Sequence, residues 1–148
     1  MKTVIFVCHG NICRSVAAEF ICKKLLKDTH HLEEFNIFSR ATSLEEIGND
    51  IYPPMKIVLK EKHIPFDKHF ANQITQKDYD LADYIFYMDE YNKRNLNRML
   101  DDYKNIIKPI TYLEKDISYI EDPWYTDNYV KVVDQLTQCI KHILEEII

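Results

Sequence analysis

The hydrophobic residues of the chain begin with a short continuous run at residues 4–7. These residues are β-branched or aromatic, which is typical of a strand that is buried on both faces. The run stops at Cys8, and from Val16 the apolar residues recur at helical spacing, which predicts a helix over about residues 15–28. The chain therefore starts as a strand, a tight loop and a helix, with a thiol at the beginning of the loop.

The same two patterns alternate along the rest of the chain. Further strands are predicted at residues 35–39, 84–88 and 106–113, the last interrupted by Pro109. Helices are predicted at about residues 54–62, 78–82, 89–100 and 128–148, and loops at 30–34, 63–77 and 114–127. Alternating strands and helices are typical of an α/β domain. We therefore expect one domain over residues 1–148, with a four-stranded parallel sheet, right-handed crossovers and helices on both faces.

The composition narrows the class of protein. The net charge of −5 argues against nucleic acid as the main partner. No apolar run is long enough for a signal peptide or a membrane span. The four cysteines are too few for a disulfide framework. We therefore expect a cytoplasmic protein with reduced thiols that does not act at a membrane.

The loop between the first strand and the first helix carries the candidate chemistry. Successive backbone N–H groups of a tight loop form a concave anion site, and the following helix start adds unpaired donors and partial positive charge. Arg14 offers a planar guanidinium that matches two phosphate oxygens, and the same field favours the thiolate form of Cys8. Gly10, one of only two glycines, lies inside this loop, where positive φ or close approach to a ligand would require it. A thiolate below a phosphate cradle is a nucleophile aimed at phosphorus.

Two other interpretations of these residues are possible. A cysteine at the end of a buried strand is often inert packing. A zinc site from Cys8, His9 and Cys13 is less favoured, because structural zinc takes four ligands and the chain has no second cluster of such residues. We therefore expect neither a metal nor a cofactor.

The loop also resembles that of a known family. It reads Val7-Cys8-His9-Gly10-Asn11-Ile12-Cys13-Arg14-Ser15, and this string is similar to the phosphate-binding loop of the low-molecular-weight protein tyrosine phosphatases. The spacing Cys-x5-Arg alone is shared by unrelated phosphatase folds, whereas the longer string close to the N-terminus is specific. The resemblance implies that phosphate is bound by His9, Gly10, Asn11, Ile12, Cys13, Arg14 and Ser15.

Asp122 is the candidate proton donor for the leaving oxygen, which a cysteinyl phosphatase requires. It is followed by Pro123, which stiffens the chain, and by Trp124 and Tyr125, whose aromatic faces suit a planar substrate ring. Asp-Pro by itself is common in ordinary turns. The resembled family carries its general acid in an Asp-Pro-aromatic-aromatic loop late in the chain, which implies this role for Asp122.

The resemblance extends over nearly the whole chain and implies a supporting network. Asn11, Ser15, Ser39 and His69 would hold the loop by hydrogen bonds, and Ser15 would donate to the thiolate. The alternative for Ser39 and His69 is that they are surface polar residues.

Several positions depart from the family pattern. His9 replaces the apolar residue that commonly follows the cysteine, and Glu45 or Glu46 falls where an aromatic residue often lines the pocket mouth. Asn72 stands in place of an arginine, and Tyr91 stands where serine is usual. The departures at His9 and at Glu45 or Glu46 leave the substrate preference open without changing the expected chemistry.

We predict a protein tyrosine phosphatase that acts on phosphotyrosine-containing proteins and releases inorganic phosphate. Cys8 attacks phosphorus to form a cysteinyl-phosphate, Arg14 holds the oxygens, and Asp122 protonates the tyrosyl oxygen. Cys13 lies five positions after Cys8 in the same loop, which makes it the predicted redox partner in a reversible disulfide.

Two other functions remain as alternatives. An arsenate reductase can use the same fold, but it resolves its adduct with downstream cysteines, and none lies between Cys22 and Cys139. A non-catalytic phosphate-binding redox sensor would have no need of both Cys8 and Asp122.

Overall fold

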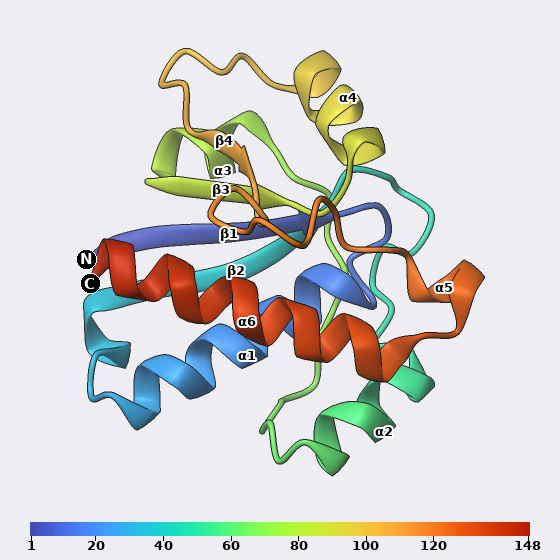
Figure 1. The fold of residues 1–148 in the computed structure, drawn as a ribbon. Helices are drawn as coiled ribbons and strands as arrows, with labels where there is room; N and C mark the ends of the chain where they lie inside the picture. Colours follow the sequence, from blue (N-terminus) through green and yellow to red (C-terminus); the bar gives the residue numbers. More distant parts are fainter.

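The four predicted strands form one parallel sheet (Figure 1). The computed structural model describes residues 1–148, and its strands are β1 (Lys2–Cys8), β2 (Phe35–Ala41), β3 (Tyr84–Tyr87) and β4 (Ile107–Pro109). Their order in the sheet is β2-β1-β3-β4, and every neighbouring pair is parallel. The first strand is therefore central, as expected for a continuous apolar run.

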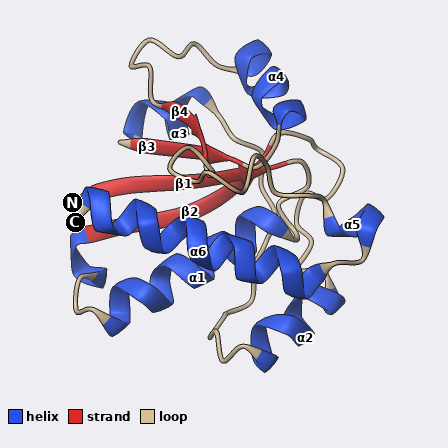
Figure 2. Cartoon of the chain, in the orientation of Figure 1, coloured by secondary structure: helices blue, strands red, loops and turns tan.

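Helices cover both faces of this sheet (Figure 2). They are α1 (Arg14–Asp28), α2 (Pro53–Glu61), α3 (Gln76–Leu81), α4 (Glu90–Met99), α5 (Pro123–Thr126) and α6 (Tyr129–Ile147), with a 3₁₀ turn, η1, at Leu32–Glu34. The long helices α1 and α6 lie together on one face, and α3 and α4 lie toward the other (Figure 1). None of these helices is both long enough and apolar enough to cross a membrane.

The alternating side chains of β1 divide the core into two clusters. Val4 and Phe6 belong to the larger cluster, which includes the apolar faces of α1 and α6. Ile5 and Val7 belong to the smaller cluster on the opposite face, beside residues of α3 and α4. All four side chains are almost completely buried. Because successive side chains of a strand point to opposite faces, an unbroken apolar run fits a strand covered on both sides.

Three predicted segments differ in detail. The fourth strand was expected over residues 106–113 but spans only Ile107–Pro109, because the chain turns directly after it, where the Tyr112 N–H donates to the Pro109 carbonyl at 3.1 Å. The predicted loop 114–127 contains the short helix α5, in which Asp122 is the N-cap and Pro123 occupies the first turn. The predicted loop 30–34 includes the turn η1.

The carboxyl ends of β1, β3 and β4 meet at one edge of the sheet. Cys8 is the last residue of β1, and Asp89 follows β3 to cap α4. The Ile120 N–H donates to the carbonyl of Met88 at 2.9 Å, which brings the segment before α5 to the same edge. In parallel sheets this edge is where ligands bind.

Candidate active site

A cavity of about 600 Å³ opens at this edge, and it contains most of the predicted site residues. We call four buried residues the floor: Cys8 and Arg14, which line the cavity, and Asn11 and Ser15, which contact the Cys8 sulfur. We call the more exposed residues around its opening the lip: His9, Glu45, Glu46, Tyr91, Trp124 and Tyr125. Asp122 lines the cavity between the two.

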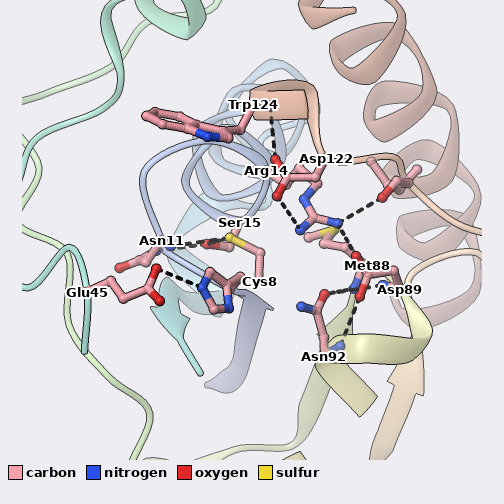
Figure 3. A network of polar contacts seen from close by, with 12 residues as sticks. Cys8, Asn11, Arg14, Ser15, Glu45, Met88, Asp89, Asn92, Asp122 and Trp124 are labelled. Carbon is pink, nitrogen blue, oxygen red and sulfur yellow. Dashed lines mark hydrogen bonds and ion pairs between the residues drawn. The ribbon is translucent and has the colours of Figure 1, made fainter. Parts of the chain in front are cut away.

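The sulfur of Cys8 lies inside the loop, 3.1 Å from the Ser15 hydroxyl oxygen (Figure 3). The backbone N–H of Asn11 donates to the same sulfur at 3.3 Å. Cys8 is 3% exposed. Two donors therefore converge on the sulfur when Cys8 is ionised and the Ser15 hydroxyl hydrogen points toward it.

Asn11 holds the loop in shape. Its Nδ2 donates to the hydroxyl oxygens of Ser15 at 2.8 Å and Ser39 at 2.9 Å, and its Oδ1 accepts from the Asn72 N–H at 3.2 Å. Nε2 of His69 lies 2.7 Å from the backbone carbonyl oxygen of Asn11. The structure thus brings together the four residues expected to support the loop, including the two that are distant in sequence.

The left-handed residue of the loop is Asn11, with φ of 60°, and not Gly10 as the sequence suggested. Asparagine tolerates this conformation better than most residues, and here its side chain is fully bonded. Gly10 lies beside the stem of Glu46, since a Cβ at this position would lie 3.4 Å from Cγ of Glu46, in ordinary van der Waals contact.

Sequence reasoning missed Glu19, which extends the network to the surface. Its Oε1 accepts from the Ser39 hydroxyl at 2.7 Å, and its Oε2 accepts from Lys23 at 2.6 Å. Glu19 is buried although it is charged. Its position one helical turn after Ser15 was the available signal, because residues four apart share a helix face.

Arg14 is 2% exposed and is held by protein groups on both sides. Its Nη1 donates to Asp89 Oδ2 at 2.6 Å and to the Ile120 carbonyl at 2.9 Å, while Nη2 lies 3.6 Å from Asp122 Oδ2. Burial lowers the pKa of Arg14, but the negative charges of Cys8 and Asp89 raise it by more than burial lowers it. The net pKa of Arg14 is therefore above its usual value. The guanidinium is therefore a fixed cation beside the nucleophile.

Asp89 was expected only as the start of a helix. It accepts from the Asn92 N–H at 2.9 Å as the N-cap of α4, and the Asn92 Oδ1 accepts from the N–H groups of Met88 and Asp89 (Figure 3). This reciprocal capping fixes the carboxylate that orients Arg14. An aspartate at the end of a predicted buried strand was the available signal, but the strand order that brings it to Arg14 comes from the structure.

The segment of Asp122 places its carboxylate at the cavity. Oδ1 of Asp122 accepts from the Trp124 N–H at 3.0 Å. The two aromatic residues that follow behave differently from each other. The ring of Trp124 packs on Tyr52 with centroids 4.9 Å apart, whereas Tyr125 is 83% exposed.

The four cysteines are free thiols and all are buried. Cys13 lies directly before α1, and burial raises its pKa well above the usual thiol value, with a further contribution from the charge of Cys8. Burial also raises the pKa values of Cys22 and Cys139 to about 12. No group of three or more potential ligand side chains is arranged to hold a metal ion.

Comparisons with known proteins agree with this geometry. The family profile described as "Low molecular weight phosphotyrosine protein phosphatase" matches residues 3–148. A rat protein of that name is 40% identical over 98% of this chain and 95% of its own length. PtpA of Staphylococcus aureus, a low molecular weight protein-tyrosine-phosphatase, is 31% identical over 100% of this chain and 95% of its own length.

Solved structures give the same result. YfkJ from Bacillus subtilis superposes with a TM-score of 0.94 at 31% identity, covering 99% of this chain and 94% of its own. The protein tyrosine phosphatase from Entamoeba histolytica superposes with a TM-score of 0.92 at 28% identity, covering 99% and 97%. The chain belongs to the low molecular weight phosphotyrosine protein phosphatase family.

Proposed function

We propose that this protein hydrolyses phosphotyrosine in proteins through a cysteinyl-phosphate intermediate. The observation that carries the proposal is the convergence of Cys8, Arg14 and Asp122 on one cavity at the carboxyl edge of the sheet. These three side chains supply a nucleophile, a fixed cation and a proton donor, which are the groups that the reaction requires.

In the first step the Cys8 thiolate attacks phosphorus in line with the leaving oxygen. The loop N–H groups and the start of α1 face the equatorial oxygens, and Arg14 adds a positive charge where negative charge develops. Ser15 donates to the thiolate and keeps it in place. Because the floor is held by its own hydrogen bonds, little reorganisation accompanies the attack.

Asp122 serves as the acid in this step and as the base in the next. Its Oδ2 lies near the Arg14 guanidinium, and its Oδ1 is held by the following turn. The neutral carboxyl gives its proton to the tyrosyl oxygen as the P–O bond breaks. The resulting carboxylate then takes a proton from water, which attacks the cysteinyl-phosphate and releases inorganic phosphate and the Cys8 thiolate.

The proposal also covers the setting of the reaction. Residues 1–148 act as one domain that needs no cofactor, with phosphotyrosine-containing proteins as partners. We place the reaction in the cytoplasm, because a nucleophilic thiolate beside Cys13 has to be kept reduced. Neither nucleic acid nor a membrane takes part, which agrees with the net charge of −5.

Turnover of nitrophenyl phosphate and of a phosphotyrosine peptide tests the proposal, with Cys8→Ser as the inactive control. We expect turnover by the wild type and none above background by the variant. A parallel assay with arsenate, thioredoxin and its reductase addresses the reductase alternative. Arsenate reduction without ester hydrolysis would contradict the proposal.

A further inference from the structure

The lip of the pocket carries two carboxylates that the proposed reaction does not use. Glu45 and Glu46 line the cavity that holds Cys8, and Glu45 reaches toward the loop (Figure 3). Oε2 of Glu45 lies 3.0 Å from Nε2 of His9, and Oε2 of Glu46 accepts from Nδ2 of Asn49 at 2.6 Å. Each carboxylate is therefore held through one oxygen, and its Oε1 has no hydrogen bond within the protein.

The segment that bears these carboxylates is tied to the phosphate-binding loop. The Ser43 N–H donates to the His9 carbonyl at 3.0 Å. The stem of Glu46 lies beside Gly10 of the loop. Both carboxylates are thus placed at the lip before any substrate binds, which lowers the entropy lost on binding.

An exposed aromatic ring adds to the same wall. Tyr91, in the first turn of α4, lines the cavity and is 53% exposed. Its ring centroid lies 5.9 Å from that of His9 and 5.9 Å from the guanidinium carbon of Arg94. The exposed π face of Tyr91 can attract a cation, and the nearby Arg94 guanidinium competes for the same ring.

The charge balance of the cavity favours a cation at the lip. Its lining includes the carboxylates Glu45, Glu46, Asp89 and Asp122. Arg14 is the permanent cation of this lining, and it is buried against Asp89. Asp89 and Asp122 lie beside Arg14 deep in the pocket, whereas the carboxylates of Glu45 and Glu46 lie farther out, at the lip, without a permanent cation of the lining beside them.

We propose that Glu45, Glu46 and Tyr91 form a cation subsite that selects phosphotyrosine segments with Lys or Arg beside the phosphotyrosine. The inference rests on the proposed function, since phosphotyrosine fills the pocket and its neighbours in the peptide meet the lip. A basic neighbour pairs with the free carboxylate oxygens, and an acidic neighbour is repelled. From the strength of exposed ion pairs, the preference for the basic peptide is about three- to tenfold in kcat/KM.

The test compares two phosphotyrosine peptides that differ only in having Lys and Arg, or Glu, on both sides of the phosphotyrosine. The enzymes are the wild type, the double variant Glu45→Gln/Glu46→Gln and the control Glu61→Gln, which removes an exposed carboxylate outside the cavity. We expect the wild type and Glu61→Gln to share the preference and the double variant to lose most of it. Tyr91→Leu should reduce the preference for the basic peptide about twofold. Salt of about 0.5 M should weaken the preference, because it screens exposed charges.

Equal kcat/KM for the two peptides with wild-type enzyme would overturn the proposal, as would an unchanged preference in the double variant. Nitrophenyl phosphate has no flanking residues and reports on the proposed function separately. If the wild type hydrolyses it but shows no peptide preference, only the cation subsite is wrong. If the wild type hydrolyses no aryl phosphate, the proposed function is wrong, and the subsite with it.

Discussion

The floor and the lip of the pocket differ in how their polar groups are satisfied. On the floor, Asn11 and Ser15 are fully buried, and their side chains bond to one another and to Cys8 and Ser39. On the lip, Tyr125 and the side chain of Glu45 are largely exposed. A buried polar group without a partner destabilises the protein, so the floor permits few substitutions, whereas the lip permits many. The floor therefore determines the chemistry, and the lip can vary to change which substrates are recognised.

The largest expected effect comes from Asp122, which lies between the two regions. Tyrosine is a poor leaving group because the pKa of its hydroxyl is about 10, so protonation of the leaving oxygen is worth about 10² to 10⁴ in rate. Asp122→Asn should slow phosphorylation of Cys8 by this factor for phosphotyrosine and by much less for nitrophenyl phosphate. It should also remove the basic limb of the kcat/KM pH profile. Single-turnover kinetics over aryl phosphates with different leaving groups provide the measurement.

Inorganic phosphate serves as the control for this variant, since its binding depends on Arg14 and the loop and should change little. If wild type and variant show the same dependence on the leaving group, Asp122 is not the acid. His9 and His69 would then be the next candidates.

A matched pair of alanine variants tests the contrast between floor and lip directly. Asn11→Ala removes buried hydrogen bonds and places alanine at positive φ, so it should lower the free energy of unfolding by about 2–4 kcal/mol. We also expect kcat/KM to fall by about 10- to 100-fold, because the loop loses its geometry. Tyr125→Ala should change stability by less than about 0.5 kcal/mol. Denaturant titrations that give equal losses for the two variants would contradict the contrast.

Replacing Cys13 should have a smaller effect, which appears only after oxidation. Peroxide oxidises the Cys8 thiolate to a sulfenic acid, and attack by the Cys13 sulfur then forms a disulfide and releases water. This bridge protects Cys8 from further oxidation, so thiol treatment should restore several-fold more activity to the wild type than to Cys13→Ser. Mass spectrometry should detect the bridged peptide in the wild type. Equal recovery by both proteins would exclude the protective role.

Glu121 gives the smallest effect, and it depends on pH. Hydrogen bonds from Lys131, Thr126 and Asn128 lower its pKa to about 2. The pKa of Glu121 in the unfolded chain is about 4.3, so its ionised carboxylate stabilises the folded protein above this pH. This stabilisation is lost as the pH falls toward 2. Glu121→Gln should therefore lower Tm by about 1–4 °C near pH 6, and the difference should disappear toward pH 2. A Tm difference that stays constant over this range would show that the carboxylate charge is not involved.

The floor could be predicted from sequence because its residues are nearly contiguous. Cys8 to Ser15 form one loop whose residue types and spacing fit phosphate, and the strand and helix on either side are strongly patterned. The exception is Gly10, since composition could not show that Asn11 takes the left-handed conformation.

The contacts that orient the floor were harder to predict, because they join segments that are distant in the chain. Asp89 meets Arg14 only because β3 lies beside β1 in the sheet. Tyr52 packs on Trp124 only because the starts of α2 and α5 lie close together. Local patterns placed each of these residues in its own element, but the pairing depends on the strand order.

Locating the phosphate on the enzyme during turnover tests the cysteinyl-phosphate intermediate directly. Wild-type protein is mixed with phosphate-labelled aryl ester, quenched within the first turnover and digested, and the labelled peptide is identified. We expect label on the peptide that contains Cys8, with none in Cys8→Ser. Label on His9 or Ser15, or turnover without any labelled intermediate, would contradict it.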